Sequence, residues 1–399
     1  MLTTLKNYPL AVNLLLGASL VLTLARAITL PYLVIYLSSQ FQLGVADIGL
    51  VIGSSLIIGS LLSLYGGFLV DSLPGHRLIL GCCAVFTSGF LGAFVAQDLW
   101  VFYVCLVAIN LAYAVIDIAV KSGFGRLLPT EARSEAFSIK YTLTNIGYAV
   151  GPFLGAGLAA LAISLPFLAS AVLGAGFFMV YCVWGDRHWA PRHASQPAAP
   201  FLAVGKLLLR DYRLVCFTLG GILSAVVFGQ FTAYLSQYLV VTTTPEAAYR
   251  IISSVVATNA LMVISLQYTI GKRITHQHLH LWLAGGLGMF IVGLAGFGLS
   301  TSLTFWVVSM AIFTLGEIIV FPAEYMFIDI IAPDHLRGMY YGAQNLGNVG
   351  AALGPVLCGM VLVSQPAHCM FYLLALFVIA GGLLYCLGAS LADKVHAPS

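Results

Sequence analysis

The chain has 399 residues, of which 60% are hydrophobic and only 8% are charged, and its formal net charge is +3. Soluble globular proteins carry roughly 25% charged residues, so this composition excludes a soluble globular class. The charge gives no reason to expect nucleic acid as a partner, because no basic face with interleaved aromatic residues is present. In lipid only helices and closed barrels satisfy the backbone, and apolar runs of about twenty residues predict spanning helices.

The apolar runs predict an all-α membrane protein with twelve transmembrane helices. We expect the spans near residues 9–37, 46–70, 78–97, 100–122, 137–160, 165–184, 213–240, 250–270, 281–299, 303–327, 339–363 and 368–391. With the N-terminus in the cytoplasm, only Arg26 and Arg250 among the 17 Lys and Arg residues fall away from the cytoplasmic side. The positive-inside rule therefore predicts a multi-pass protein with both termini in the cytoplasm.

The sequence repeats at an offset near half its length. Tyr36-Leu37-Ser38 in the first span returns as Tyr234-Leu235-Ser236 in the seventh, and Gly151-Pro152 in the fifth returns as Gly354-Pro355 in the eleventh. We therefore predict two pseudo-symmetric six-helix halves, 1–184 and 212–399, joined by a cytoplasmic linker at 185–211. Such repeats place a substrate site at their interface, near the membrane midplane.

The first span carries Arg26 at mid-depth, where a charge costs roughly 3 kcal/mol. Arg26 is either a structural partner of a buried acid or a cavity cation that holds an acid or binds a carboxylate. Tyr32 and Tyr36 are further cavity candidates. After the second span, Gly67, Asp71 and Arg77 form a short motif at a helix end. Its carboxylate can pair with Arg77 or cap a neighbouring helix; the alternative is a plain topogenic loop.

The fourth span places several polar residues on one face: Asn110, Tyr113, Asp117 and Lys121. Asp117 and Lys121 are four residues apart and can pair, which favours a gate; proton carriage by Asp117 is the alternative.

The fifth span adds Lys140 as a gating candidate and Tyr141 and Asn145 as cavity candidates, followed by the small-residue motif Gly147, Gly151, Pro152 and Gly155. Small residues four apart let helices approach closely, and proline bends a helix.

In the second half, Glu317 is an isolated acid in the middle of the tenth span, a candidate for reversible protonation or for a structural hydrogen bond. Glu324 lies two turns on along the same face, as a gate or a second proton site. The remaining cavity candidates are Gln230, Tyr234, Tyr341, Asn345 and Asn348.

No signal for a cofactor, a metal or an enzyme active site is found in the sequence. His276, His278 and His280 alternate in a short basic loop, where we interpret them as topological, and the eight cysteines lack zinc-ligand spacing. No phosphate-binding loop or nucleophile motif is present.

The motif from Gly67 to Arg77, the Gly-Pro helix and the twelve spans resemble the major facilitator superfamily. The group that the chain is most similar to is the twelve-helix drug or metabolite:proton antiporters, including bacterial multidrug and putative dipeptide exporters. This resemblance implies alternating access, a monomer in the bacterial inner (plasma) membrane, and small-molecule substrates and protons as partners. It also implies proton-coupled efflux of small amphipathic molecules.

Within that resemblance, Glu317, Asp117 and Arg26 are the expected proton-coupling residues. Lys140 departs from the related antiporters, in which an acid can occupy this region. The alternative function is a proton-coupled importer (symporter) of a peptide, a sugar or a siderophore.

Overall fold

The computed structural model describes residues 2–187, 189 and 200–391. The predicted linker 185–211 and the predicted second half 212–399 therefore lie in part outside the described residues. Every regular element in the described ranges is a helix, and no strand occurs in them. The first part of the chain contains α1 (Leu2–Asn7), α2 (Leu10–Phe41), α3 (Val45–Ser72), α4 (Gly75–Val95), α5 (Leu99–Leu127), α6 (Thr130–Leu161) and α7 (Leu165–Trp184).

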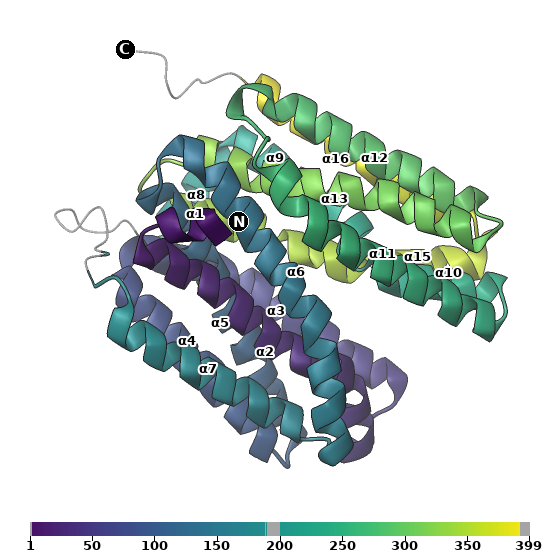
Figure 1. Cartoon of the computed structure of the whole chain (residues 1–399), viewed down its shortest axis with the longest axis horizontal. Helices are drawn as coiled ribbons and strands as arrows, with labels where there is room; N and C mark the ends of the chain where they lie inside the picture. Colours follow the sequence, from purple (N-terminus) through teal and green to yellow (C-terminus); the bar gives the residue numbers. More distant parts are fainter. Residues whose placement is uncertain (1, 188, 190–199, 392–399) are drawn as a thin grey trace. The chain divides into compact units, whose positions relative to one another are not determined.

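The remaining elements follow Pro200. They are α8 (Phe201–Arg210), α9 (Tyr212–Phe228), α10 (Phe231–Thr242), α11 (Pro245–Gly271), the short 3-10 helix η1 (His276–His278), α12 (Leu279–Leu299), α13 (Leu303–Ile331), α14 (Arg337–Gln344), α15 (Gly347–Ser364) and α16 (Cys369–Ser390). Figure 1 shows these helices in the colours of the sequence.

Short polar and proline signals set where the helices begin. Pro9, Pro74, Pro129 and Pro200 directly precede α2, α4, α6 and α8; proline suits this place because its φ is fixed and its missing N–H is not needed there. Asp98 caps α5 by accepting hydrogen bonds from the backbone N–H groups of Trp100 and Val101. Local sequence therefore accounts for where these helices start.

The described helices include ten that are long and apolar enough to cross a bilayer, and the bent pair α8–α9 supplies a possible eleventh. α8 meets α9 at 86°. Two predicted spans are not among the ten. The predicted fifth span is α6, whose first half is polar and charged, and the predicted seventh span is divided into α9 and α10 by Gly229 and Gln230.

The chain forms two compact units. Unit 1 comprises Met1–Ala199 and Ala332–Asn345, and unit 2 comprises Pro200–Ile331 and Leu346–Ser399. The segment that carries α14 thus belongs to unit 1, although the helices on either side of it in the chain, α13 and α15, belong to unit 2. The predicted halves 1–184 and 212–399 stay a prediction.

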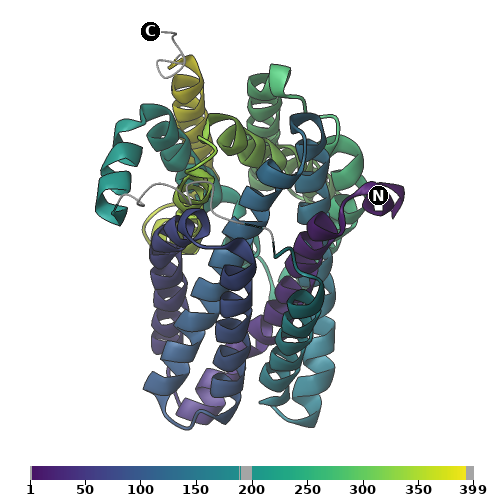
Figure 2. The ribbon, with the colours of Figure 1, turned by 90° about the vertical axis from the view of Figure 1, so that its left-hand side faces the viewer.

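In unit 1, α2 packs against α6 along glycines. The helices of this unit are visible from a second direction in Figure 2. A Cβ atom on Gly151 would lie 2.4 Å from the Ala27 Cβ, and one on Gly155 would lie 2.2 Å from the Ile28 carbonyl oxygen. Only glycine permits this approach, because real Cβ contacts are longer. The small-residue motif therefore lets α6 pack closely against α2, the helix that carries Arg26.

In unit 2, α9 packs against α15 in a similar way. A Cβ on Gly350 would lie 2.0 Å from the Ile222 carbonyl oxygen, and one on Gly354 would lie 2.5 Å from that of Val226. α6 and α15 also share an internal proline. The sequence repeat thus corresponds to the same kind of helix pair within each unit.

Candidate functional site

The guanidinium of Arg26 is held by residues from α2, α3 and α5. Its Nη2 donates to Asn110 Oδ1 at 3.1 Å, and its Cζ lies 4.2 Å from the centroid of the Tyr113 ring. Asn110 Nδ2 donates in turn to the Ser55 hydroxyl at 3.2 Å, and the hydroxyls of Tyr113 and Thr23 are 2.8 Å apart. Both neighbours of the guanidinium are therefore fixed by further hydrogen bonds.

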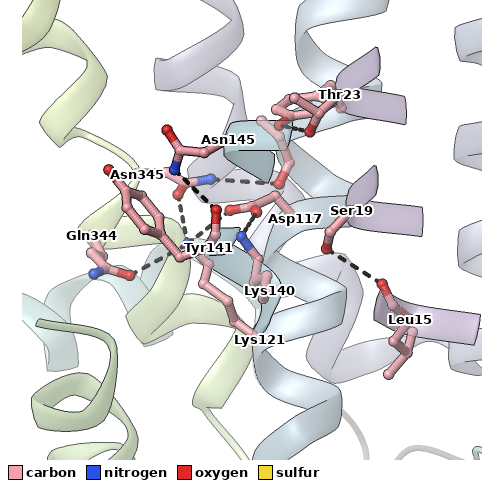
Figure 3. Close-up of polar contacts among 12 residues, drawn as sticks. Leu15, Ser19, Thr23, Asp117, Lys121, Lys140, Tyr141, Asn145, Gln344 and Asn345 are labelled. Carbon is pink, nitrogen blue, oxygen red and sulfur yellow. Dashed lines mark hydrogen bonds and ion pairs between the residues drawn. The ribbon is translucent and has the colours of Figure 1, made fainter. Parts of the chain in front are cut away.

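One turn beyond Tyr113, the carboxylate of Asp117 is shared by two lysines, as Figure 3 shows. Its Oδ2 lies 2.9 Å from Lys121 Nζ and its Oδ1 lies 2.6 Å from Lys140 Nζ. Lys121 also donates to Gln344 Oε1 at 3.3 Å and to Asn345 Oδ1 at 3.0 Å. The predicted pair of Asp117 and Lys121 is thus one part of a larger cluster in unit 1.

Two more of the predicted residues join this cluster. Tyr341 is fully buried, and its ring centroid lies 5.3 Å from Lys121 Nζ. Asn345, in the turn that ends α14, donates from Nδ2 to the Ala114 carbonyl at 3.5 Å. Asn348 is exposed, at the start of α15 in unit 2. The break between Gln344 and Gly347 separates α14 from α15, so Asn348 lies on a different helix from Tyr341.

Asp71 caps α14 within unit 1. Its Oδ1 accepts a hydrogen bond from the Gly338 N–H at 2.7 Å, and its Oδ2 accepts one from the Met339 N–H at 2.9 Å. A carboxylate is stabilised at a helix N-terminus because the N–H groups there are otherwise unsatisfied. Gly67 makes the approach possible, since a Cβ on it would lie 2.3 Å from the Gly338 carbonyl oxygen. Arg77 is exposed, so Asp71 caps a helix and does not pair with Arg77.

Unit 2 holds a separate polar group around Glu317, which is only 7% exposed in the middle of α13. Asn259 Nδ2, on α11, donates to Glu317 Oε2 at 2.6 Å and to the Thr314 hydroxyl at 3.1 Å. Tyr234 is fully buried and lies close enough to Glu317 for an electrostatic interaction. No hydrogen-bond partner of the Tyr234 hydroxyl is found in the described part of the chain.

Glu324 is also buried, and its Oε1 accepts a hydrogen bond from the Tyr385 hydroxyl on α16. Glu317 and Glu324 therefore lie two turns apart on α13, each with a neutral hydrogen-bond donor.

Several predicted cavity residues lie elsewhere. Tyr36 is 3% exposed and packs among Phe41, Phe102 and Phe167, with ring centroids 4.8–6.1 Å away. Tyr32 donates to the Pro152 carbonyl at 3.1 Å, which ties α2 to α6. The structure thus brings neither tyrosine into the polar group around Arg26.

Three further candidates make local contacts. Asn145 donates to the Tyr141 carbonyl of its own helix at 2.9 Å, and Tyr141 is buried. Gln230 is exposed at the break between α9 and α10.

Some residues of these groups were missed by sequence reasoning, among them Ser55, Asn259, Thr314 and Tyr385. A signal for Asn259 was present, since it lies eight residues before Gln267 and shares its helix face. Gln267 donates to the Ile318 carbonyl at 3.1 Å. No comparable signal marked Ser55 or Tyr385, because serine and tyrosine occur throughout the apolar spans.

Comparison with known proteins gives consistent matches along nearly the whole chain. Residues 15–355 match the family model of the Major Facilitator Superfamily. The chain is 36% identical over 382 residues to the MFS-type transporter YdeE of Escherichia coli (strain K12), covering 93% of each protein. It is 24% identical to a Na(+), Li(+), K(+)/H(+) antiporter of Planococcus maritimus, covering 91% of this chain and 92% of that protein.

Among solved structures, the transporter FucP in its outward conformation aligns with a TM-score of 0.74 at 13% identity, covering 96% of this chain and 99% of FucP. This similarity concerns the fold.

Proposed function

The chain belongs to the major facilitator superfamily, a family of membrane transporters and not of enzymes, and from this premise we propose that it is a proton-coupled antiporter. It exports small amphipathic molecules, such as drugs, dipeptides or metabolites, by alternating access. It acts as a monomer in the bacterial inner membrane, with both termini in the cytoplasm.

The buried carboxyl of Glu317 carries this proposal. A carboxyl group in the middle of a span is costly when charged. Binding of one proton to Glu317 therefore changes the energy of the conformation in which this side chain is buried. Asn259 can hydrogen-bond to both the ionised and the protonated form of Glu317, because an amide donates to a carboxylate and accepts from a carboxylic acid. In the proposed cycle, protonation at the outward face releases substrate, and deprotonation at the inward face resets the carrier.

Two further observations support antiport. The Planococcus relative, which aligns with most of this chain, is named as a cation/H(+) antiporter. In addition, the motif from Gly147 to Gly155 packs α6 against α2 by close contact, and this Gly-Pro helix is part of the resemblance described above, in which the most similar group is antiporters.

Proteoliposomes with an imposed pH gradient test the proposal, with phenylalanyl-alanine as the probe. Antiport predicts that an acidic lumen drives the probe inward as protons leave, whatever the orientation of the protein in the liposome. We expect Glu317→Gln to reduce this accumulation at least tenfold, to the level of protein-free liposomes. The matched variant Glu246→Gln, at an exposed glutamate of α11, keeps it.

Two results would contradict the proposal. Full gradient-driven transport by the Glu317→Gln variant would remove Glu317 from proton coupling. Accumulation only when the exterior is acidic would make the protein a symporter.

A further inference from the structure

We propose that Arg26 is the anchor of an anion site in unit 1, and that the exported molecules carry a carboxylate which Arg26 binds. This inference rests on the proposed export function, because it names the chemical class of the substrate. It is argued from the hydrogen bonds, charges and depth of Arg26.

In the described part of the chain, Arg26 contacts only the neutral side chains of Asn110 and Tyr113. Within the ranges that the structure describes, its one hydrogen-bond acceptor is Asn110, and no carboxylate lies in ion-pair distance of it. The guanidinium has five N–H donors, so most of them remain for a ligand. Asp117, the nearest acid along α5, uses one oxygen for Lys121 and the other for Lys140. The predicted role of Arg26 as the structural partner of a buried acid is therefore not supported.

Arg26 lies inside an apolar candidate span, Leu10–Leu30. A charge inside such a span is costly and asks for a counter-ion. A bound anion would lower that cost, because its charge is opposite to that of the guanidinium.

The surroundings fix the guanidinium and make the local charge positive. Asn110, held by Ser55, binds one edge of the guanidinium, and Tyr113, held by Thr23, covers one face. A planar fork fixed in this way suits the two oxygens of a carboxylate.

The charged set of Arg26, Asp117, Lys121 and Lys140 contains three cations and one carboxylate. Its net positive potential attracts anions into a low-dielectric interior.

Ligand-induced thermal stabilisation of the purified full-length protein tests the proposal without a proton gradient. The probes are two pairs that differ only in the carboxylate: phenylalanyl-alanine with phenylalanyl-alaninamide, and 4-phenylbutyrate with 4-phenylbutyramide. We expect the acids, and not the amides, to raise the melting temperature of the wild-type protein.

Arg26→Gln should weaken acid binding at least tenfold, which corresponds to about 1.4 kcal/mol. Arg26→Lys should keep part of the affinity, since it retains the charge but loses the fork.

Controls separate a binding role from a structural one. Arg210→Gln removes an exposed arginine of α8 and should leave acid binding unchanged. Without ligand, Arg26→Gln should melt at the wild-type temperature or above it, because it removes a mid-membrane charge that has neutral partners. A wild-type protein that responds equally to acids and amides, or an Arg26→Gln variant that binds the acids with wild-type affinity, would overturn the proposal.

The two proposals fail separately. Acid binding that depends on Arg26, together with transport that no pH gradient drives, would refute the antiport and leave the anion site in place. Gradient-driven transport of both acids and amides would refute the anion site and leave the antiport in place.

Discussion

Asp117 is one carboxylate that lies between two ammonium groups, and the geometry around it explains why Lys140 occupies a position inside the fifth span. The side chains of Lys121 and Lys140 are only 2% and 4% exposed, and two such cations so close together repel each other strongly when no anion lies between them. The presence of Asp117 therefore makes a lysine at position 140 tolerable. Sequence reasoning found the pair with Lys121 from its spacing of four residues, but the pair with Lys140 connects two helices.

Asp117→Asn should destabilise unit 1, because it leaves two buried cations with no carboxylate between them. Removing one partner of a buried ion pair costs about 3 kcal/mol or more. Denaturant unfolding of the purified protein would measure the loss. The double variant Asp117→Asn/Lys140→Met removes one of the two cations and should recover most of the stability. A single variant as stable as the wild type would show that Asp117 does not hold the lysines in place.

At the scale of the elements, the contact between α2 and α6 positions the candidate site. Ala27 and Ile28, which face Gly151 and Gly155, directly follow Arg26 in α2. Any side chain on these glycines would push α2 away from α6 and would move Arg26 with it. The sequence motif predicted close packing but did not say which helix is the partner.

Gly151→Val should lower stability by about 1–3 kcal/mol, the usual cost of overpacking, since even its Cβ would lie 2.4 Å from Ala27. Gly157→Val is the matched control, because nothing lies within 4 Å of a Cβ at Gly157 on the same helix. Thermal unfolding of both variants would make the comparison. Equal melting temperatures would mean that α2 and α6 are not closely packed at Gly151.

At the scale of the whole molecule, the segment of residues 332–345 stands out, because it belongs to unit 1 while the chain on both sides of it belongs to unit 2. Within unit 1, Asp71 fixes this segment by capping α14, and Lys121 fixes it through Gln344 and Asn345. The chain therefore passes between the units at residues 331–332 and again at residues 345–346.

Asp71→Ala should release the start of α14, because two of its backbone N–H groups lose their acceptor. Loss of a helix cap costs about 1 kcal/mol, and we expect amide hydrogen exchange in residues 337–341 to accelerate roughly fivefold. Asp98→Ala, which removes the cap of α5, should instead affect only the start of α5. Unchanged exchange in α14 of the Asp71→Ala variant would contradict the capping role.

The sequence by itself determined the fold class, because apolar runs of about twenty residues have the length of helices that cross a bilayer and satisfy their own backbone there. It also identified the main charged residues, since each charge inside an apolar span is costly and therefore visible in the sequence. Only the tertiary structure decided which of these residues meet. Lys140 reaches Asp117 from another helix, Asp71 caps α14 at a distance of 267 residues in the chain, and Tyr36 packs among phenylalanines. Helical periodicity relates residues within one helix, whereas these contacts depend on how several helices pack together.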